Sequence, residues 1–314
     1  MIQLKICGRA GNQFFQYATV YAYMKKNNIK ENINISFEEL KKRKTDDKSF
    51  YDTLSLFNVD DYNTIDKVKF TNYQMILDFL YRANLKVIRT IKRKMGKEML
   101  YKDYKILDKI WHKILNKNGL YYYMPTNMNF YKSRNRNIVF YGSFESEKYF
   151  EQFRNDILKM FIPKENEKSE NKELYNIIEN TNSICVTIRR GDFLIDKFKK
   201  DFYICTPDYF KKAICKMNEV IEKPQYIVFS DDVDWCKNNM NFPENTMYES
   251  GKDEIWEKIR LMYSCKHFII SNSTFSWWAQ YLSRNENKIV IAPKIWNKFE
   301  YCQQIYNKKW IIIN

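Results

Sequence analysis

The stretch VTIRRGDF, residues 186–193, closes the apolar run SICVTI (183–188) with two arginines, a glycine and an aspartate. An apolar run without polar alternation is typical of a strand buried on both faces of a parallel sheet. Comparable runs follow at 226–229, 267–270, 289–292 and 310–313, with helix-like segments between most of them. The pattern predicts an α/β fold with a parallel sheet, in which ligands bind beyond the carboxyl ends of the strands.

The N-terminal half contains fewer clear elements. Residues 2–7 read as a strand that leads through GRAGNQ (8–13) into a helix, and NIVFYGSF (137–144) reads as another strand. The segment PKENEKSENKE (163–173) is charged, lacks apolar residues and has the composition of a linker. A chain of 314 residues suits two domains of ~150 residues. We therefore expect domains at 1–162 and 163–314.

Polar groups follow four of the predicted strands, in GRAGNQ (8–13), RRGD (189–192), SDD (230–232) and SNSTFSWW (271–278). Arg189 and Arg190 can each present a fork of N–H groups to phosphate oxygens, and together they could neutralise a diphosphate without a metal. The alternative is that both arginines pair with acidic neighbours or extend into solvent. Gly191 permits a tight turn directly after them.

Helix starts and glycines provide further candidate ligand-binding positions at the predicted strand ends. Ser273 or Thr274 is a suitable N-cap for a helix whose first amides form an anion site, although capping alone would also explain these residues. Gly8 and Gly11 allow left-handed backbone or close approach of a ligand, but they match neither the dinucleotide fingerprint nor the P-loop. Asp232 and Asp234 form a D-x-D pattern, which in other proteins can bind a divalent metal. We do not expect a metal there, because the arginines already supply the countercharge and because the start of a helix favours Asp.

The balance of 53 basic against 38 acidic residues gives a net charge of +15 and favours anionic partners. No nucleic-acid recognition module is apparent, so nucleic acid is not expected as a partner. Residues 73–97 predict an amphipathic helix with seven basic and no acidic residues from Arg82 to Lys97. Its apolar stripe either lies on an anionic membrane or packs on the protein core with a solvated basic face.

Seven scattered cysteines favour reduced thiols. The N-terminal sequence lacks the pattern of a secretory signal, and no uncharged apolar run approaches the ~18 residues of a membrane span. We expect a cytoplasmic protein, with peripheral association at the inner face of the cytoplasmic membrane as an open alternative.

The motifs GRAGNQFFQYA, IRRGD, FSDD, SNSTFSWWAQYL and VIAPKIW, spanning residues 8–296, resemble the α-1,2-fucosyltransferase family in order and spacing. The resemblance implies a GT-B-like fold, with two Rossmann-like domains facing a cleft, GDP-fucose in the C-terminal domain and the acceptor in the N-terminal one. It implies a galactoside α-1,2-fucosyltransferase that moves L-fucose from GDP-β-L-fucose, with inversion and without a metal or other cofactor, to the 2-hydroxyl of a galactose in a polysaccharide or lipopolysaccharide. The acceptor's identity, and whether it is lipid-linked, stay open.

The resemblance also assigns roles in the C-terminal domain. It implies that Arg189 contacts the diphosphate with Arg190 in support, that Asp231 or Asp232 contacts guanine, and that Thr274 and Ser276 contact phosphate beside Ser273 and Phe275. Thr187 stands where the H-x-R-R-x-D element of related fucosyltransferases has His; it can bind a base or pack, but it cannot perform acid–base chemistry near pH 7.

Three points remain hypotheses from the sequence. Asp192 is either the base for the acceptor hydroxyl or an anchor of the arginine loop. We expect Gly8, Gly11, Asn12 and Gln13 to bind substrate, with Asn12 contacting the sugar. The alternative functions are a transferase for another sugar nucleotide and a non-catalytic polyanion-binding protein, whose binding would collapse with salt.

Overall fold

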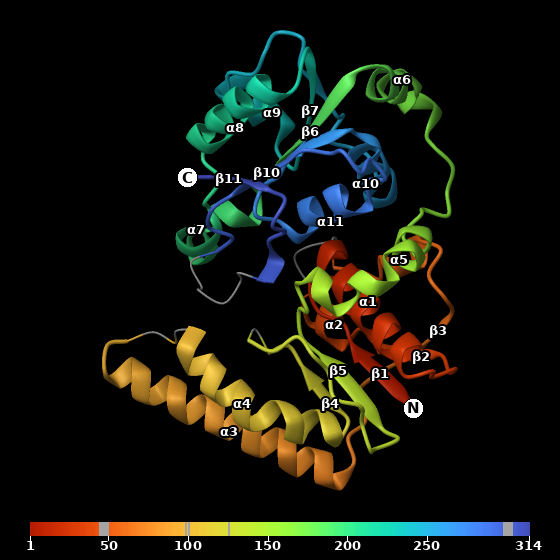
Figure 1. The fold of residues 1–314 in the computed structure, drawn as a ribbon, viewed down its shortest axis with the longest axis vertical. Coiled ribbons are helices and arrows are strands. Elements are labelled where there is room, and N and C mark those ends of the chain that lie inside the picture. Colours follow the sequence, from red (N-terminus) through yellow and green to blue (C-terminus); the bar gives the residue numbers. More distant parts are fainter. Residues whose placement is uncertain (44–49, 98, 100, 125, 298–303) are drawn as a thin grey trace. The chain divides into compact units, whose positions relative to one another are not determined.

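The computed structural model describes residues 1–43, 50–97, 99, 101–124, 126–297 and 304–314 (Figure 1). These residues form two compact units. Unit 1 comprises the described residues of Met1–Leu54, Val59–Met160 and 304–305, and unit 2 those of Ser55–Asn58, 161–297 and Tyr306–Asn314. The excursion Ser55–Asn58 belongs to unit 2 because Phe57 forms a β-bridge with Pro163 and packs edge-on against Phe161.

Unit 1 is built on a five-stranded sheet in which every pair of neighbours is parallel. The order is β3 (Tyr62–Ile65), β2 (Ile33–Ser36), β1 (Ile2–Lys5), β5 (Ile138–Tyr141) and β4 (Leu120–Tyr122). Helix α1 (Ala10–Lys26) follows β1 and buries almost all of its residues, including Phe14, Phe15 and Tyr17. Helices α2 (Glu38–Arg43) and α5 (Arg154–Met160) are shorter. The strands predicted at 2–7 and 137–144 are confirmed as β1 and β5.

Helices α3 (Asn72–Lys94) and α4 (Tyr101–Lys117) run beside each other in unit 1 (Figure 1). Thr71 and Gln74 form a capping box that starts α3. Leu77 of α3 and Leu115 of α4 are buried in a cluster with residues of β4 and β5, so one side of this helix pair covers the sheet. The apolar stripe predicted from the sequence lies elsewhere: Ile76, Phe79, Leu80, Val87 and Ile91 are all exposed. The expectation that this stripe packs on the core is therefore wrong.

Unit 2 contains a six-stranded sheet, and again all neighbouring strands are parallel. The order is β11 (Ile311–Ile313), β10 (Val290–Pro293), β9 (His267–Ile269), β6 (Asn182–Ile188), β7 (Pro224–Ser230) and β8 (Met247–Tyr248). The helices of this unit are α6 (Lys172–Asn180), α7 (Asp196–Phe202), α8 (Pro207–Val220), α9 (Val233–Asn239), α10 (Ile255–Ser264) and α11 (Thr274–Leu282). All five predicted strands are present, and the two parallel-sheet α/β units confirm the predicted fold class.

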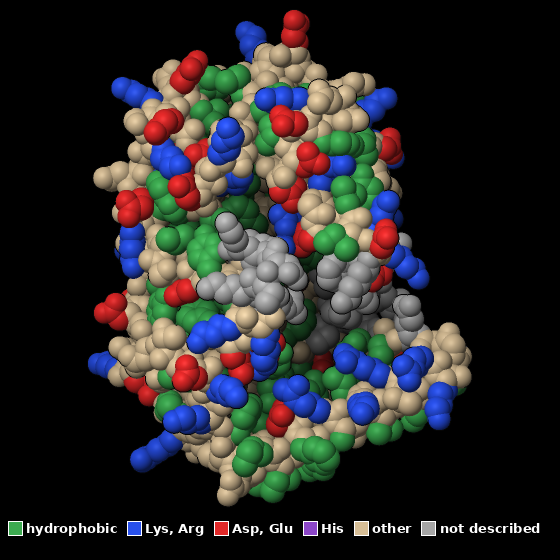
Figure 2. Space-filling view, turned by 180° about the vertical axis from the view of Figure 1, so that it is seen from behind, with side chains coloured by type: hydrophobic (Ala, Val, Ile, Leu, Met, Phe, Trp, Pro, Cys, Tyr) green, Lys and Arg blue, Asp and Glu red, His purple; other side chains and the backbone are tan. Residues whose placement is uncertain are grey.

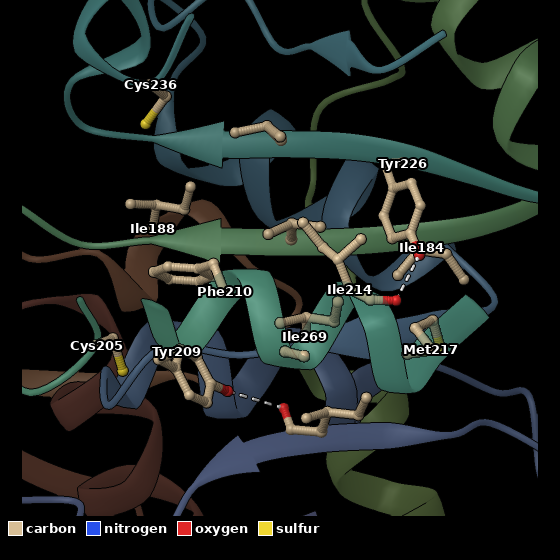
Figure 3. Close-up of a cluster of buried hydrophobic side chains, with 14 residues drawn as sticks. Ile184, Ile188, Cys205, Tyr209, Phe210, Ile214, Met217, Tyr226, Cys236 and Ile269 are labelled. Carbon is tan, nitrogen blue, oxygen red and sulfur yellow. Dashed lines mark hydrogen bonds between the residues drawn. The ribbon is translucent and has the colours of Figure 1, made fainter. Parts of the chain in front are cut away.

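The core of unit 2 forms where α8 packs on the sheet, in a cluster with apolar residues of β6, β7, β9 and β10 (Figure 3). Phe210, Ile214 and Met217 recur on one face of α8 and are buried among apolar residues of the sheet. Two tyrosines bury their rings here and satisfy their hydroxyls internally: Tyr209 Oη donates to the carbonyl of Ile270 at 2.8 Å, and Tyr226 Oη to that of Ile214 at 3.3 Å. This rigid packing fixes the strands whose ends carry the polar motifs.

Two short 3₁₀ turns, at Glu147–Tyr149 and Glu151–Phe153, precede α5, which starts at Arg154. Among the described residues, no helix combines the length and apolar character that a membrane crossing needs.

Candidate functional site

Three adjacent strands of unit 2 bring the C-terminal motifs together. The central strand β6 lies between β9 and β7, with Ile188 of β6 paired with Ser230 of β7 and Val186 with Ile269 of β9. Because the strands are parallel, the loops after all three emerge at the same edge of the sheet. The residues RRGD, SDD and SNSTFS therefore share one site, as the sequence predicts for strand ends.

Arg189 lies at the centre of this edge and contacts two carboxylates. Its Nε and Nη2 donate to Asp192 Oδ1 at 3.0 and 2.7 Å, and its Nη1 lies 2.8 Å from Asp231 Oδ2. The side chain remains about a quarter exposed. Each terminal nitrogen of a guanidinium carries two N–H groups, so the Arg189 fork has donors beyond those that these contacts need. The arginine is held in one orientation while it can still bind an anion.

Arg190 is more deeply buried and is fixed on every side. Its guanidinium stacks over the Trp235 ring, 3.2 Å from the ring centroid, and its Nε donates to Asp232 Oδ2 at 3.1 Å. Its backbone N–H donates to Asp231 Oδ1 at 2.9 Å. A cation held between a ring face and a carboxylate has little freedom to turn toward a ligand. The Arg190 side chain is thus held in place by protein groups.

Gly191 is required by the close approach of the β7 loop. A Cβ atom at this position would lie 2.7 Å from Asp231 Oδ2, inside van der Waals contact. Asp231 could not then reach both Arg189 and the Arg190 amide, so this glycine keeps the two loops together.

The aspartates of the site are bound to protein groups. Asp192 accepts hydrogen bonds from both Nε and Nη2 of Arg189, which fits the anchoring role better than that of a base. Asp232 is the N-cap of α9, accepting from the Trp235 amide at 3.3 Å while it also pairs with Arg190. Three carboxylates surround two guanidinium groups, so this cluster has one net negative charge before any ligand arrives.

Thr187 is buried, and its Oγ1 accepts a hydrogen bond from the Ser271 amide at 3.0 Å. The Ser271 hydroxyl in turn lies 3.1 Å from that of Ser276 in α11. The threonine therefore connects β6 to the loop before α11. This geometry favours the packing role for Thr187 and gives the Ser276 hydroxyl an internal partner.

Helix α11 begins with Ser273 as its N-cap, although the Ser273 side chain makes no capping bond. Ser273, Thr274 and Phe275 are half-buried, so they border the accessible edge of the site. Trp277 and Trp278 are fully buried, so the paired tryptophans belong to the core. The helix start adds a positive dipole end beside the arginine loop.

In unit 1 the GRAGNQ motif joins β1 to α1. Gly8 has a φ of +79°, and a Cβ there would lie 2.8 Å from the side chain of Asn12. Gly11 is buried in the first turn of α1. Gln13 is fully buried: its Nε2 donates to the Tyr51 carbonyl at 2.8 Å, and its Oε1 accepts from the amide and hydroxyl of Thr53. Gln13 thus positions the 51–53 segment, while Asn12 is more accessible.

Glu145 is a functional candidate that the sequence reading missed. It follows β5, which neighbours β1, and its Oε1 lies 3.5 Å from Asn12 Nδ2. Loss of solvation raises the pKa of its carboxyl to about 7. The preceding residue, Phe144, has a φ of +50°, an uncommon conformation for a bulky residue and one that costs on the order of 1–3 kcal/mol. A carboxyl that titrates near pH 7 at a strand end has the properties of a general base.

The sequence contains a signal for one missed residue, Trp235, and none for the other, Glu145. Trp235 follows the SDD motif, so an aromatic partner for an arginine was available within one helical turn. Glu145 lies in the loop after the predicted strand 137–144, but nothing in the sequence shows that its carboxyl loses solvent.

The fold and the strand-end cluster define an α/β protein that presents arginines, carboxylates and a helix start at one edge of a parallel sheet. The chain belongs to glycosyl transferase family 11, whose sequence profile matches residues 1–314. The O-antigen biosynthesis glycosyltransferase WbnK of Escherichia coli is 28% identical over 327 residues, which cover 98% of each chain. The α-1,2-colitosyltransferase of Escherichia coli is 32% identical over 188 residues, which cover 56% of this chain and 62% of that protein.

Further similarities are more distant. The galactoside α-(1,2)-fucosyltransferase 1 of Homo sapiens is 28% identical over 102 residues, covering 31% of this chain and 28% of that protein. Among solved structures, the fucosyltransferase NodZ from Bradyrhizobium has a TM-score of 0.47 at 12% identity, covering 89% of this chain and 92% of that one. The ADP-heptose heptosyltransferase II of Escherichia coli has a TM-score of 0.42 at 10% identity, covering 100% and 90%.

Proposed function

We propose that this protein is a galactoside α-1,2-fucosyltransferase, which transfers L-fucose from GDP-β-L-fucose to the 2-hydroxyl of a galactose in a surface glycan. The family match over residues 1–314 carries this proposal. Two relatives add support, because one is an α-1,2-colitosyltransferase and the other a galactoside α-(1,2)-fucosyltransferase. The strand-end cluster of unit 2 supplies the cationic and amide donors that a nucleotide diphosphate requires.

The mechanism we propose follows the movement of charge. As the bond between the fucose anomeric carbon and the β-phosphate oxygen breaks, negative charge grows on that oxygen and the sugar acquires oxocarbenium character. Arg189 and the first amides of α11 stabilise the leaving GDP more than the bound substrate, which lowers the barrier. The acceptor hydroxyl attacks the opposite face of the anomeric carbon, so the configuration inverts.

We assign the acceptor proton to Glu145 rather than to Asp192. Asp192 is engaged by Arg189 through two hydrogen bonds, whereas Glu145 has a carboxyl whose pKa of about 7 suits proton uptake near neutral pH. Glu145 also lies beside Asn12, the residue that we expect to contact the sugar. In this scheme Asp192 is a positioning residue that orients Arg189.

The guanidinium groups of the site, rather than a divalent ion, are proposed to hold the diphosphate. The Asp231 and Asp232 carboxylates lie against Arg189 and Arg190 at 2.8 and 3.1 Å. A cation that bound these carboxylates would displace Arg189, which we expect to contact phosphate, and Arg190, which supports it.

The deciding experiment incubates the purified protein with GDP-fucose, EDTA and a panel of β-galactosides, and measures GDP release and fucosylated product. We expect product with an α-1,2 linkage in the presence of the chelator. An Arg284→Ala variant, altered at an exposed arginine outside the cluster, serves as the control and should keep its activity. Loss of all turnover in EDTA, restored by added manganese, would refute the metal-free mechanism.

A second candidate function is transfer from a different sugar nucleotide. The similarity to an α-1,2-colitosyltransferase favours a colitosyl donor as the specific alternative. Running the same assay with the GDP-colitose and GDP-fucose donors in parallel separates the two functions by the ratio of their kcat/KM values. A preference for colitose would reassign the donor while leaving the proposed phosphate contacts in place.

A further inference from the structure

The helix pair α3–α4 exposes a stripe of large apolar side chains that no described residue of unit 1 covers. Phe79 is 70% exposed, and Ile76 and Val87 are each 56% exposed. Surface helices normally turn such a stripe toward the core. Here the core-facing positions are taken by Leu77 and its neighbours, so the exposed stripe is a separate face of the helix. The exposed apolar residues of α3 are Tyr73, Met75, Ile76, Phe79, Leu80, Val87 and Ile91.

Basic side chains border this stripe. Between Arg82 and Lys97 the chain has seven basic and no acidic residues. Four of them, together with Leu85 and Thr90, line a shallow hollow of about 430 Å³ on the helix surface: Arg82, Lys86, Arg89 and Arg93. Lys92 is engaged by Asp103 of α4 at 2.7 Å and holds the two helices together instead.

Helix α4 repeats the same combination. Ile106, Ile110 and Ile114 are exposed at intervals of four residues. Lys109, Lys113 and Lys117 lie beside them and line a second hollow of about 410 Å³. Figure 2 shows apolar side chains along the lower border of the molecule with Lys and Arg side chains beside them. Both helices therefore offer apolar side chains flanked by cations.

We propose that the α3–α4 helix pair docks on an anionic lipid surface, with its apolar side chains among the acyl chains and its lysines and arginines at the headgroups. An amphipathic helix of this composition lies in the plane of the interface. The absence, among described residues, of a helix suited to cross a bilayer agrees with a peripheral attachment. The proposal concerns attachment alone and does not depend on the identity of the donor sugar.

The charge of this face decides between a membrane and a second copy of the chain. Asp78 pairs with Arg82 and Asp103 with Lys92. No acidic residue lies between Arg82 and Lys97, so two copies joined through this face would bring Lys86, Arg89 and Arg93 of each copy together without an acidic residue of that segment to offset them. An anionic membrane instead neutralises these cations, because each basic residue near its surface gains attraction to the lipid headgroups. Charge complementarity therefore favours lipid.

The test measures co-sedimentation of the full chain with vesicles of phosphatidylcholine alone and of phosphatidylcholine mixed with phosphatidylglycerol. We expect binding to the anionic vesicles that weakens with salt. The triple variant Lys86→Glu, Arg89→Glu, Arg93→Glu should bind on the order of a hundredfold more weakly. The double variant Phe79→Ser, Val87→Ser should retain the salt-sensitive attraction and lose the binding that persists at high salt.

A matched triple variant, Lys211→Glu, Lys252→Glu, Lys309→Glu, changes the same net charge at exposed lysines of unit 2 and should keep most of the binding. Circular dichroism and turnover of a water-soluble acceptor verify that each variant is folded. Equal loss in both triple variants would assign binding to net charge and overturn the proposal. So would a dimer, measured by sedimentation, that dissociates when Phe79 and Val87 are replaced.

Discussion

Arg189 and Asp231 follow adjacent strands, β6 and β7, and Nη1 of the arginine lies 2.8 Å from Oδ2 of the aspartate. The same aspartate accepts the Arg190 amide through its other oxygen. One carboxylate thus fixes both the side chain of the first arginine and the backbone of the second. This arrangement holds the donors that we propose for phosphate in place before a substrate arrives, which is the condition under which such donors stabilise a transition state most.

Replacing Arg189 with Lys should lower kcat by about 10²- to 10³-fold, because an ammonium group cannot contact Asp192, Asp231 and a phosphate with the geometry of a guanidinium. Steady-state kinetics of GDP-fucose turnover measures the effect, and Arg284→Ala controls for loss of an exposed charge. Normal turnover by the lysine variant would remove Arg189 from the proposed mechanism.

Asp192→Asn separates the two roles considered for this residue. If Asp192 orients Arg189, the variant should hold the Arg189 side chain less firmly in its orientation. We then expect a moderate fall in kcat and an unchanged pH dependence. GDP should bind the variant at least as tightly as the wild type, because the substitution removes one negative charge from a cluster of three carboxylates and two guanidinium groups. Loss of the acidic limb of the pH–rate profile would instead identify Asp192 as the base, and calorimetric titration with GDP provides the independent readout.

The strand ends were predictable from the sequence, whereas the contacts among them were not. Apolar runs locate β6, β7 and β9, but the pairing of Arg189 with Asp231 depends on the order β9-β6-β7, which long-range packing determines. The two-residue strand β8 is too short to give a pattern. Periodicity indicated the amphipathic helix α3 correctly. The same periodicity is expected for a buried and for an exposed apolar stripe, so the sequence alone could not show that Phe79 is exposed.

Glu145→Gln should lower kcat by about 10²- to 10⁴-fold, the usual contribution of a general base. In the wild-type protein, activity should rise with pH through about 7, where the Glu145 carboxyl loses its proton, and this limb should vanish in the variant. Glu151→Gln, at an exposed position nearby, is the control.

The stability of the same variant gives a second readout. Because folding raises the pKa of Glu145 to about 7, the folded state keeps its proton longer than the unfolded chain, and the stability present below pH 4.5 is lost as the pH rises through 7. Glutamine stays neutral, so Glu145→Gln should be more stable than the wild type at pH 8 although it is less active. A variant that is both inactive and less stable at pH 8 would indicate a structural role instead.

His112 predicts how stability responds to acid. The residue is 1% exposed, and burial lowers the pKa of its imidazole to about 4, while its Nδ1 lies 3.0 Å from Asn127 Nδ2. An unfolded chain binds the proton near pH 6.5, so between pH 6.5 and 4 the unfolded state takes up a proton that the folded state excludes. The free energy of unfolding should therefore decrease as the pH is lowered from 6.5 to 4, and His112 should account for on the order of 2–3 kcal/mol of this decrease.

Urea denaturation from pH 7.5 to 4 measures this slope, and His112→Gln should reduce it. The other histidine, His267, also has a lowered pKa through burial and the adjacent Lys266, so part of the slope should persist in the variant. If the glutamine variant fails to fold, an NMR titration of the wild-type imidazole gives the same information. A slope that is identical in both proteins, or an imidazole that titrates near pH 6.5 in the folded state, would show that His112 accepts a proton without unfolding and would contradict the prediction.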